Sequence, residues 1–325
     1  MVVGFLMPAH SIWDDQIARI KSEYPAHRFF EALSPDSPQF EELDILIASR
    51  FSAEDLEKAR RLKCIFQPLT GINHLPVEAL RSRGVRVFNV HSNAKDVAEH
   101  ALAMTLAFYG RIIEYHCDLS RGKWHGMWVK GGKEDNLDSI FGKTCLILGT
   151  GAIGSELANL FKAFSCTVHG WRKNKALAAP EGFDDIVTDL KEAIAVSEIV
   201  AVALPATPLT DGLLSKDILM SMAGKFLINV GRGSIVDEEG LYLALEKGIL
   251  KGAAIDTWYN YPQGGKYGFP SRFPLHEARN IVLSPHVAGS TNQAVARSVS
   301  DTLTNLRKFL DSGWSENEVD LSARY

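Results

Sequence analysis

Two residues with complementary chemistry, Arg232 and His286, each follow an apolar run in this 325-residue sequence. Arg232 lies within the stretch Asn229-Val230-Gly231-Arg232-Gly233, and His286 follows Ser284-Pro285. A guanidinium is a permanent planar cation that suits a carboxylate and can polarise a carbonyl group beside it. An imidazole titrates near neutrality, so it can give a proton to a developing alkoxide or take one from a hydroxyl. Together with a hydride donor they would reduce a 2-keto acid, whereas taken singly each could be a structural ion-pair or loop residue.

A glycine-rich turn offers a site for that hydride donor. It has the sequence Gly149-Thr150-Gly151-Ala152-Ile153-Gly154 and follows an apolar run, Thr144–Leu148. Apolar residues with helical spacing come next, at Leu157, Leu160, Phe161 and Phe164. In such a motif the glycines permit a tight turn, close approach to a pyrophosphate and close packing of helix on strand, and the helix N-terminus attracts the phosphates. We therefore predict a dinucleotide site here, the alternative being a strand-to-helix connection without a ligand.

The next apolar run, Thr167–Trp171, ends in Arg172-Lys173. Proteins that bind NAD commonly have an Asp or Glu in this region to accept hydrogen bonds from the ribose hydroxyls, whereas an arginine can pair with the 2′-phosphate of NADP. We predict that NADP(H) is preferred. Binding of NAD(H) as well is the alternative, in which Arg172 stacks on the adenine ring.

The composition indicates a globular protein that acts on small molecules. Apolar residues make up 46% and charged residues 23% of the sequence, the net charge is -4, and no dense basic run suggests a nucleic-acid partner. The first seven residues lack the pattern of a signal peptide and no run has membrane-spanning length, so we expect a cytoplasmic protein with no membrane partner. The cysteines lack metal-binding spacing, so we expect no metal and reduced, buried thiols at Cys64, Cys117, Cys145 and Cys166.

Apolar runs alternate with helical stretches along the chain, which is typical of parallel α/β sheets. Beyond those already named, the predicted strands are Val2 to Leu6, Ile45 to Ala48, Cys64 to Gln67, Val85 to Asn89, Glu198 to Leu204, Phe226 to Val230, Gly252 to Ile255 and Ile281 to Ser284. We predict an α/β protein of two domains. Residues 97–290 form a doubly wound (Rossmann) dinucleotide-binding domain, and residues 1–96 with 291–325 form a smaller flavodoxin-like substrate domain.

The remaining segments connect these elements. We predict a helix over 52–62 capped by Ser52 and Asp55, a long helix over 97–116, a loop or arm over 122–132, and a last helix over 291–310 that returns to the first domain. Ligands of open parallel sheets bind at the carboxyl ends of the strands. We therefore expect Arg232, Asp256 and His286 to converge beside the nicotinamide in a cleft between the domains.

The sequence resembles the D-isomer-specific 2-hydroxyacid dehydrogenase family over nearly all of its length. The matching stretches are Leu69 to Asn73, Asn93, Val97 to His100, Leu148 to Gly154, Leu204-Pro205 with Thr210, Asn229 to Asp237, Gly252 to Asp256 and Ser284 to Gly289. The resemblance implies reversible reduction of a small 2-keto acid to a D-2-hydroxy acid with a nicotinamide cofactor. It also implies a homodimer formed through the nucleotide domain.

The resemblance assigns roles to individual residues. It implies that Arg232 binds the substrate carboxylate, that His286 is the acid/base, and that the backbone at Thr70 and Gly71, with Asn93, completes the substrate site. Besides the glycine motif, the cofactor would contact Arg172, Lys173, Leu204, Pro205, Thr210, Val230, Gly231, Arg232, Asp256, His286, Ala288 and Gly289. The substrate side chain stays open, from glyoxylate or hydroxypyruvate to phenylpyruvate, because it depends on loops that carry residues such as Trp124, Trp128 and Tyr261.

One position departs from the family. A glutamate normally lies five residues after the aspartate that matches Asp256, and this sequence has Tyr261 there. A glutamate orients the histidine and favours its charged form, whereas a tyrosine can form a hydrogen bond but is neutral. We therefore predict that Tyr261 assists a His286 that protonates less readily, so that reduction is fastest at a more acid pH. The alternative is that another acid, Glu99 or Glu277, replaces the glutamate.

Two other functions are kept as alternatives. Formate dehydrogenases of the same superfamily have a glutamine in place of that glutamate and an asparagine where this sequence has Asn93, and they transfer a hydride without a proton shuttle. Here Gln263 lies two residues too late, and the stretch from His286 to Gly289 resembles the hydroxyacid branch. The second alternative is a non-catalytic NAD(P)H-sensing binding protein, since the C-terminal-binding-protein corepressors also resemble this family.

Overall fold

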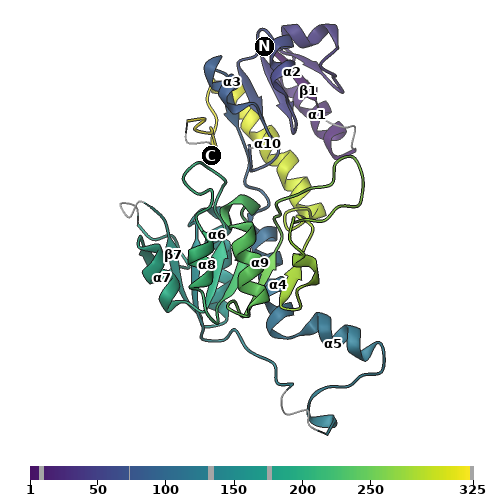
Figure 1. Ribbon diagram of the computed structural model, residues 1–325. Helices are drawn as coiled ribbons and strands as arrows, with labels where there is room; N and C mark the ends of the chain where they lie inside the picture. Colours follow the sequence, from purple (N-terminus) through teal and green to yellow (C-terminus); the bar gives the residue numbers. More distant parts are fainter. Residues whose placement is uncertain (7–10, 73, 131–134, 174–177, 323–325) are drawn as a thin grey trace. The chain divides into compact units, whose positions relative to one another are not determined.

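The computed structural model describes residues 1–6, 11–72, 74–130, 135–173 and 178–322 (Figure 1). The chain forms two compact units. Unit 1 consists of Met1–Asn93 and Ser290–Tyr325, and unit 2 of Ala94–Gly289. The sequence had suggested boundaries after residues 96 and 290, whereas the structure divides the chain after residues 93 and 289.

Unit 1 is built on a parallel five-stranded sheet of order β2-β1-β3-β4-β5. The strands are β1 (Val2–Leu6), β2 (Arg28–Phe30), β3 (Ile45–Ala48), β4 (Cys64–Phe66) and β5 (Arg86–Phe88). All four residues of β3 are buried, as expected for a parallel strand that is covered on both faces and therefore is a continuous apolar run. The strand order is that of flavodoxin-like folds, so the predicted fold class of this unit is confirmed.

The helices of unit 1 are α1 (Ser11–Glu23), the 3-10 helix η1 (Pro38–Glu42), α2 (Ala53–Lys58), α3 (Val77–Ser82) and α10 (Asn292–Ser312). The helix α10 brings the end of the chain back to the sheet, because Phe309 packs edge-on against the stacked rings of Phe66 and Phe88. The predicted cap of α2 is confirmed. Ser52 and Asp55 each accept a hydrogen bond from the other's backbone N–H.

Unit 2 is built on a parallel seven-stranded sheet of order β12-β11-β10-β9-β6-β7-β8. The strands are β6 (Thr144–Leu148), β7 (Thr167–Trp171), β8 (Asp185–Val187), β9 (Ile199–Val202), β10 (Phe226–Asn229), β11 (Gly252–Ile255) and β12 (Ile281–Leu283). The chain winds outward from β6 in one direction and then, from β9, in the other, which is the doubly wound order of a Rossmann fold. The predicted fold class is confirmed, and the switch point for ligand binding lies between β6 and β9.

The helices of unit 2 are α4 (Ala94–Tyr109), α5 (Ile112–Leu119), η2 (Gly126–Trp128), α6 (Ala152–Ala163), α7 (Leu190–Val196), α8 (Lys216–Met220), η4 (Gly233–Ile235), α9 (Glu238–Glu246) and η5 (Leu275–Glu277). The helix after the glycine motif, α6, buries Leu157 and Phe161 as its spacing predicted. Leu160 and Phe164 are only partly buried against the same core.

The prediction of one long helix over 97–116 is wrong. The chain leaves the helix at Gly110, and Arg111 has a left-handed φ of 48° that separates α4 from α5. Residues 112–130 and 135–139, which we call the arm, project from the body of unit 2 (Figure 1). The predicted loop or arm over 122–132 belongs to this segment, with residues 131 and 132 outside the described part.

The structure also bears on two expectations from the sequence, one on membrane-spanning segments and one on the cysteines. None of the helices in the described ranges is both long and apolar enough to cross a bilayer. All four cysteines are free thiols; Cys64, Cys145 and Cys166 are buried, whereas Cys117 is exposed. Burial of Cys117 was therefore a wrong prediction, because α5 lies on the arm and has no buried residue.

Candidate active site

The glycine motif forms the turn between β6 and α6. Gly149 has a φ of 105°, and a Cβ there would lie 2.7 Å from the carbonyl oxygen of Ala203. A Cβ on Gly154 would lie 2.0 Å from the Gly149 carbonyl oxygen, so only glycine permits this packing. Gly151 and Ala152 at the start of α6 are exposed, and the space beside Gly151 is open. An exposed helix N-terminus beside open space fits the pyrophosphate of a dinucleotide.

The segment after β9 lies beside this turn, as the contact of Gly149 with Ala203 shows. The hydroxyl of Thr210 donates to the carbonyl oxygen of Pro205 at 2.6 Å and accepts from the N–H of Thr207 at 2.8 Å. These bonds fix the turn that follows β9. Of the predicted cofactor contacts at this edge, Pro205 is exposed and the others are half-buried: Thr150, Ile153, Leu204 and Thr210.

Arg172 and Lys173 follow β7, the strand next to β6. Arg172 is half-buried, and one of its guanidinium N–H groups donates to the carbonyl oxygen of Ala178 at 3.0 Å. Lys173 is exposed. Two cations thus stand at the carboxyl end of the strand where a Rossmann fold meets the adenosine ribose.

Arg232 lies directly after β10, and the preceding strand end fixes its backbone. The side chain of Asn229 accepts from the N–H of Gly231 at 3.1 Å and donates to the carbonyl oxygen of Arg232 at 3.1 Å. Val230 and Gly231 are buried, and Arg232 is half-buried. Its guanidinium donates to the Gly231 carbonyl oxygen at 2.7 Å, and within the described ranges it has no carboxylate partner. Burial lowers the pKa of Arg232, although an arginine stays charged.

His286 follows β12 and has a left-handed φ of 58°. Its Nδ1 lies 2.7 Å from the hydroxyl of Tyr261, and that hydroxyl also accepts from the N–H of Trp258 at 3.1 Å. The imidazole is accessible to solvent, yet the atoms around it desolvate it in part. This desolvation, followed by the positive charge of Arg232, lowers the pKa of His286, while the charge of Asp256 acts in the opposite direction. Arg232 and His286 are therefore electrostatic neighbours.

Asp256 follows β11 and is 1% exposed. Its carboxylate accepts hydrogen bonds from the N–H groups of Val287 and Ala288, at 3.0 and 3.2 Å, and from the hydroxyl of Ser284. The carboxylate of Asp256, which the resemblance places against the cofactor, thus accepts hydrogen bonds from the loop that carries His286. Glu99 and Glu277 are the two acids that could replace the missing glutamate. Neither of them is among the charges that shift the pKa of His286, and the carboxylate of Glu277 lies 3.8 Å from the imidazole of His276.

The three predicted substrate residues of unit 1 lie near the end of β4 and the end of unit 1's first segment. The hydroxyl of Thr70 is 2.9 Å from the Val90 carbonyl oxygen and 3.1 Å from Oδ1 of Asn93. Gln67 donates to the carbonyl oxygen of Gly71. Within the described residues, the N–H groups of Thr70 and Gly71 have no hydrogen-bond acceptor, so they can bind an anion.

Three residues that had no assigned role in the sequence are joined by hydrogen bonds in the segment that leads to His286: Trp258, Ser284 and His100. His100 and Ser284 lie in stretches that carry the family resemblance, so their presence was visible but their mutual contact was not. No cluster of His, Cys, Asp or Glu in the described ranges could hold a metal ion.

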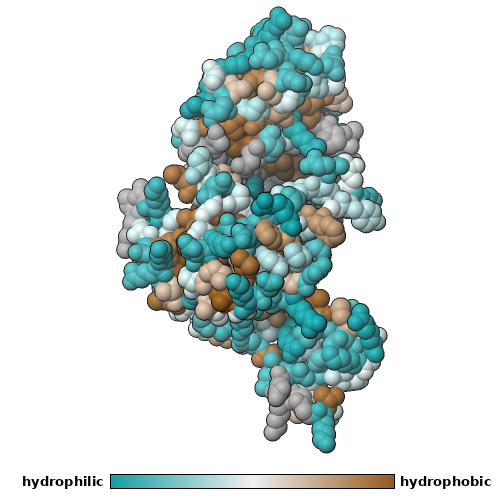
Figure 2. All heavy atoms as spheres, in the orientation of Figure 1, coloured by the Kyte–Doolittle hydropathy of each residue, from teal (hydrophilic) through white to brown (hydrophobic). Residues whose placement is uncertain are grey.

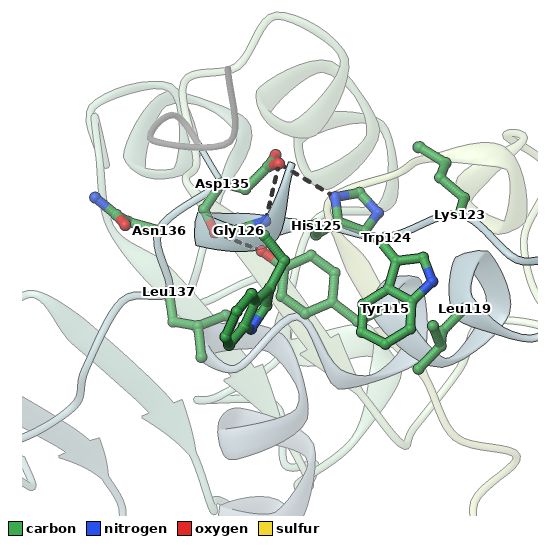
Figure 3. A pocket seen from close by; sticks show the side chains of 10 residues that line it. Tyr115, Leu119, Lys123, Trp124, His125, Gly126, Asp135, Asn136 and Leu137 are labelled. Carbon is green, nitrogen blue, oxygen red and sulfur yellow. Dashed lines mark hydrogen bonds and ion pairs between the residues drawn. The ribbon is translucent and has the colours of Figure 1, made fainter. Parts of the chain in front are cut away.

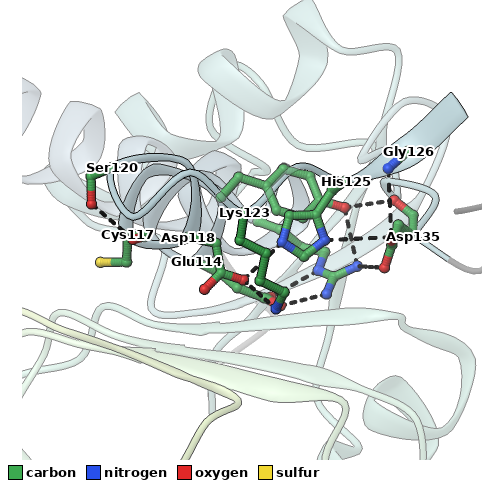
Figure 4. Close-up of polar contacts among 10 residues, drawn as sticks. Glu114, Cys117, Asp118, Ser120, Lys123, His125, Gly126 and Asp135 are labelled. Carbon is green, nitrogen blue, oxygen red and sulfur yellow. Dashed lines mark hydrogen bonds and ion pairs between the residues drawn. The ribbon is translucent and has the colours of Figure 1, made fainter. Parts of the chain in front are cut away.

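The arm has an ordered interior in spite of its exposure. His125 lies between two carboxylates, with Nε2 2.8 Å from Asp118 and Nδ1 3.4 Å from Asp135 (Figure 4). The imidazole ring stacks on the ring of Tyr115. The hydroxyl of Tyr115 donates to the carbonyl oxygen of Asp135 at 2.6 Å. These contacts fold the arm upon itself.

The outer surface of the arm is apolar in part, and Figure 2 shows brown residues among hydrophilic ones there. Trp124 is 60%, Met127 86% and Trp128 80% exposed. A pocket of about 350 Å³ lies between α5 and the returning segment, with Leu119, Trp124 and Leu137 among its lining residues (Figure 3). Trp124 and Trp128, which were named above because their loops could shape the substrate pocket, both lie on the arm.

Comparisons with known proteins agree with this architecture. The family described as D-isomer specific 2-hydroxyacid dehydrogenase, NAD binding domain, matches residues 102–288. The D-3-phosphoglycerate dehydrogenase of Archaeoglobus fulgidus is 29% identical over 285 residues, which are 86% of this chain and 52% of that protein. The enzyme of that name from Mycobacterium tuberculosis is 31% identical over 288 residues, with shares of 87% and 52%.

The chain spans about half the length of these curated relatives. A crystal structure of a protein from Pyrococcus horikoshii covers 98% of this chain and 95% of its own, with a TM-score of 0.80 and 26% identity. The family match extends over more than half of the chain and includes the glycine motif, Arg232 and His286. The chain therefore belongs to the D-isomer specific 2-hydroxyacid dehydrogenase family.

Proposed function

We propose that this chain is a 2-keto acid reductase that uses a nicotinamide cofactor, preferably NADPH, and forms D-2-hydroxy acids in a reversible reaction. The observation that carries the proposal is Arg232, a half-buried cation without a carboxylate partner in the described residues, next to the imidazole of His286. A partly buried charge without a protein counter-ion is stabilised by an anionic ligand. When Arg232 binds the carboxylate of a 2-keto acid, the keto group of that acid lies beside His286, the proposed acid/base.

Each group in this arrangement has one task. The cofactor, when bound at the glycine motif, would supply the hydride. Arg232 holds the carboxylate and polarises the keto oxygen next to it. His286 uses Nε2, the nitrogen that Tyr261 does not contact, to donate a proton to that oxygen and to remove it in the reverse reaction. In unit 1, the N–H groups of Thr70 and Gly71, with Asn93 beside them, would bind the carboxylate as well.

A substrate panel tests the proposed function. Glyoxylate, hydroxypyruvate, phenylpyruvate and 3-phosphohydroxypyruvate would each be offered with NADPH and with NADH, and formate would be offered with NADP⁺. The phosphorylated acid belongs in the panel because the relatives are named D-3-phosphoglycerate dehydrogenase. We expect reduction of at least one 2-keto acid and no oxidation of formate. Oxidation of formate alone would favour formate chemistry, and cofactor binding without any turnover would favour a sensing protein.

Arg172→Ala is expected to weaken the use of NADPH far more than that of NADH. Charge-assisted bonds from Arg172 to a 2′-phosphate would be lost, and this raises KM for NADPH roughly tenfold or more. Steady-state kinetics with both cofactors measure the effect, with Arg279→Ala as the control that removes an exposed arginine outside the predicted cofactor contacts. An equal change in KM for the two cofactors would contradict a phosphate-binding role for Arg172.

Tyr261→Glu is expected to shift the pH dependence of reduction. A carboxylate at hydrogen-bond distance from Nδ1 favours the imidazolium, so the pKa of His286 rises and the alkaline limb of the profile moves upward by about 1 pH unit or more. The profile of kcat between pH 5 and 9 measures this shift.

The matched control is Tyr261→Phe, which removes the hydrogen bond without adding a charge. Its alkaline limb should stay as acid as that of the wild type, because desolvation and Arg232 still lower the pKa of His286. Identical profiles for the wild type and Tyr261→Glu would rule out an electrostatic coupling between these two residues.

We further propose that two copies of the chain associate through the arm, in keeping with the homodimer that the family resemblance implies. Large exposed apolar side chains on a projecting segment are typical of a surface that a partner covers. Replacing Met127 and Trp128 by glutamate is expected to give a monomer, as measured by light scattering after size exclusion. Tyr267→Glu, a change at a 96% exposed residue outside the arm, is the control. A wild-type monomer, or a variant that stays dimeric, would contradict this interface.

A further inference from the structure

A buried group of hydrogen bonds lies behind the loop of the proposed acid/base and has no part in the chemistry described above. Nε2 of His100, on α4, lies 2.8 Å from the hydroxyl of Ser284, which follows β12. The Ser284 hydroxyl donates to Asp256, which follows β11. Asp256 then accepts from the N–H groups of Val287 and Ala288 at 3.0 and 3.2 Å. One helix and two strand ends are thus joined to the loop.

The directions of these bonds follow from the number of hydrogens available. A serine hydroxyl has one hydrogen, which Ser284 gives to the carboxylate of Asp256, so its oxygen must accept from the Nε2–H of His100. The carbonyl oxygen of Ser284 accepts from the indole N–H of Trp258 at 2.7 Å. Both the hydroxyl and the carbonyl of this residue are therefore fixed by donors from other elements.

Burial makes this network sensitive to the loss of one member. Asp256 is 1%, Ser284 6% and Trp258 6% exposed. Hydrogen bonds are stronger in such surroundings than in water, and a buried polar group that loses its partner is destabilised. If His100 no longer donates, the Ser284 oxygen loses one of its two partners, and the hydroxyl that holds Asp256 is no longer fixed.

The loop needs support because His286 has a left-handed φ of 58°, a conformation that is unfavourable for a residue with a Cβ. The two N–H groups immediately after it, of Val287 and Ala288, are those that Asp256 holds. Fixing the next two peptide groups restricts the backbone that carries the imidazole. The same contacts also set the distance between the Asp256 carboxylate and the imidazole.

We propose that His100 is a positioning residue for the acid/base, acting through Ser284 and Asp256 to hold the imidazole of His286 where it can reach the substrate oxygen. The proposal rests on the proposed function for its effect on turnover, but not for its effect on the loop. It gives a role to the histidine of the stretch Val97–His100, which the chemistry of the reaction does not use.

The test compares His100→Leu, which cannot donate, with His100→Gln, whose amide can donate to the same oxygen. Amide hydrogen exchange of residues 284–289 in the ligand-free chain is measured first, and kcat and KM for NADPH second. In His100→Leu we expect exchange at Val287 and Ala288 to be at least about tenfold faster, kcat to fall by a similar factor, and KM for NADPH to change little. His100→Gln should restore slow exchange and most of kcat.

The matched control is His116→Leu, the same substitution at an exposed histidine of α5, which should leave exchange in the loop unchanged. Wild-type exchange in His100→Leu, or equally fast exchange in the leucine and glutamine variants, would overturn the proposal. If His100→Leu does not fold, Ser284→Ala breaks the same link with a small change of volume and is judged by the same readout. If the wild type reduces no 2-keto acid, the proposed function fails, and the exchange result alone decides on the loop.

Discussion

Arg232→Leu is expected to lower kcat/KM for the 2-keto acid by about 10³-fold, the range seen when a preorganised donor to a reacting oxyanion is removed. The guanidinium has no carboxylate partner in the described residues and a backbone fixed by Asn229, so it is available to a ligand and held in place. Leucine replaces the apolar stem of the arginine at this half-buried position but lacks the positive charge and the N–H donors of the guanidinium. Steady-state kinetics measure the loss, and fluorescence titration measures the smaller change in NADPH affinity.

The Arg232→Lys variant separates charge from geometry. A lysine keeps the positive charge but cannot donate two parallel hydrogen bonds to a carboxylate, so we expect kcat/KM between those of the wild type and the leucine variant. An Arg232→Leu variant that binds NADPH normally and retains more than a tenth of the wild-type kcat/KM would contradict the carboxylate-binding role of Arg232.

His286→Asn is expected to lower kcat by a factor of about 10² to 10⁴ in both directions of the reaction, the range attributed to general acid–base catalysis. Asparagine is the suitable replacement because it tolerates the left-handed backbone found at this position. The variant should also lose the pH dependence that the imidazole imposes. Measurements of kcat from pH 5 to 9, with thermal unfolding as a check of the fold, test both effects.

The direction of the wild-type pH dependence follows from the lowered pKa of His286. Reduction needs the imidazolium as the proton donor, so its rate is highest at acid pH and falls as the pH rises through this pKa. Oxidation needs the neutral ring as the base, so its rate rises over the same interval. An Asn variant that keeps the wild-type pH profile would assign the proton transfer to another group.

Much of the fold could be predicted because parallel strands buried on both faces are continuous apolar runs. This is the case for β3, β6 and β10, and the glycine motif between β6 and α6 identified the nucleotide unit. The strands β2 and β8 were missed because each lies at the edge of its sheet, begins with an exposed charged residue, Arg28 or Asp185, and has at most one buried residue. The break between α4 and α5 was missed because a left-handed arginine has no sequence signal comparable to that of glycine.

The candidate site was predictable where polar residues follow strands, as Arg232 and His286 do. The network around them was not, because it depends on contacts between distant segments. His100 and Ser284 are 184 residues apart, and the carboxylate of Asp256 is used by a loop about thirty residues later. Tyr261 was noticed only as a departure from the family pattern, and the structure adds its hydrogen bonds to Nδ1 of His286 and from the Trp258 N–H.

The most direct test of the proposed reaction follows the hydride itself. The enzyme would be incubated with NADPH carrying deuterium at C4 of the nicotinamide, on each face in turn, and with the best 2-keto acid of the panel. One of the two labelled cofactors should transfer deuterium to C2 of the product, and the product should be the D isomer. A product of the L configuration, or one without deuterium at C2 from either cofactor, would contradict the reaction proposed for Arg232 and His286.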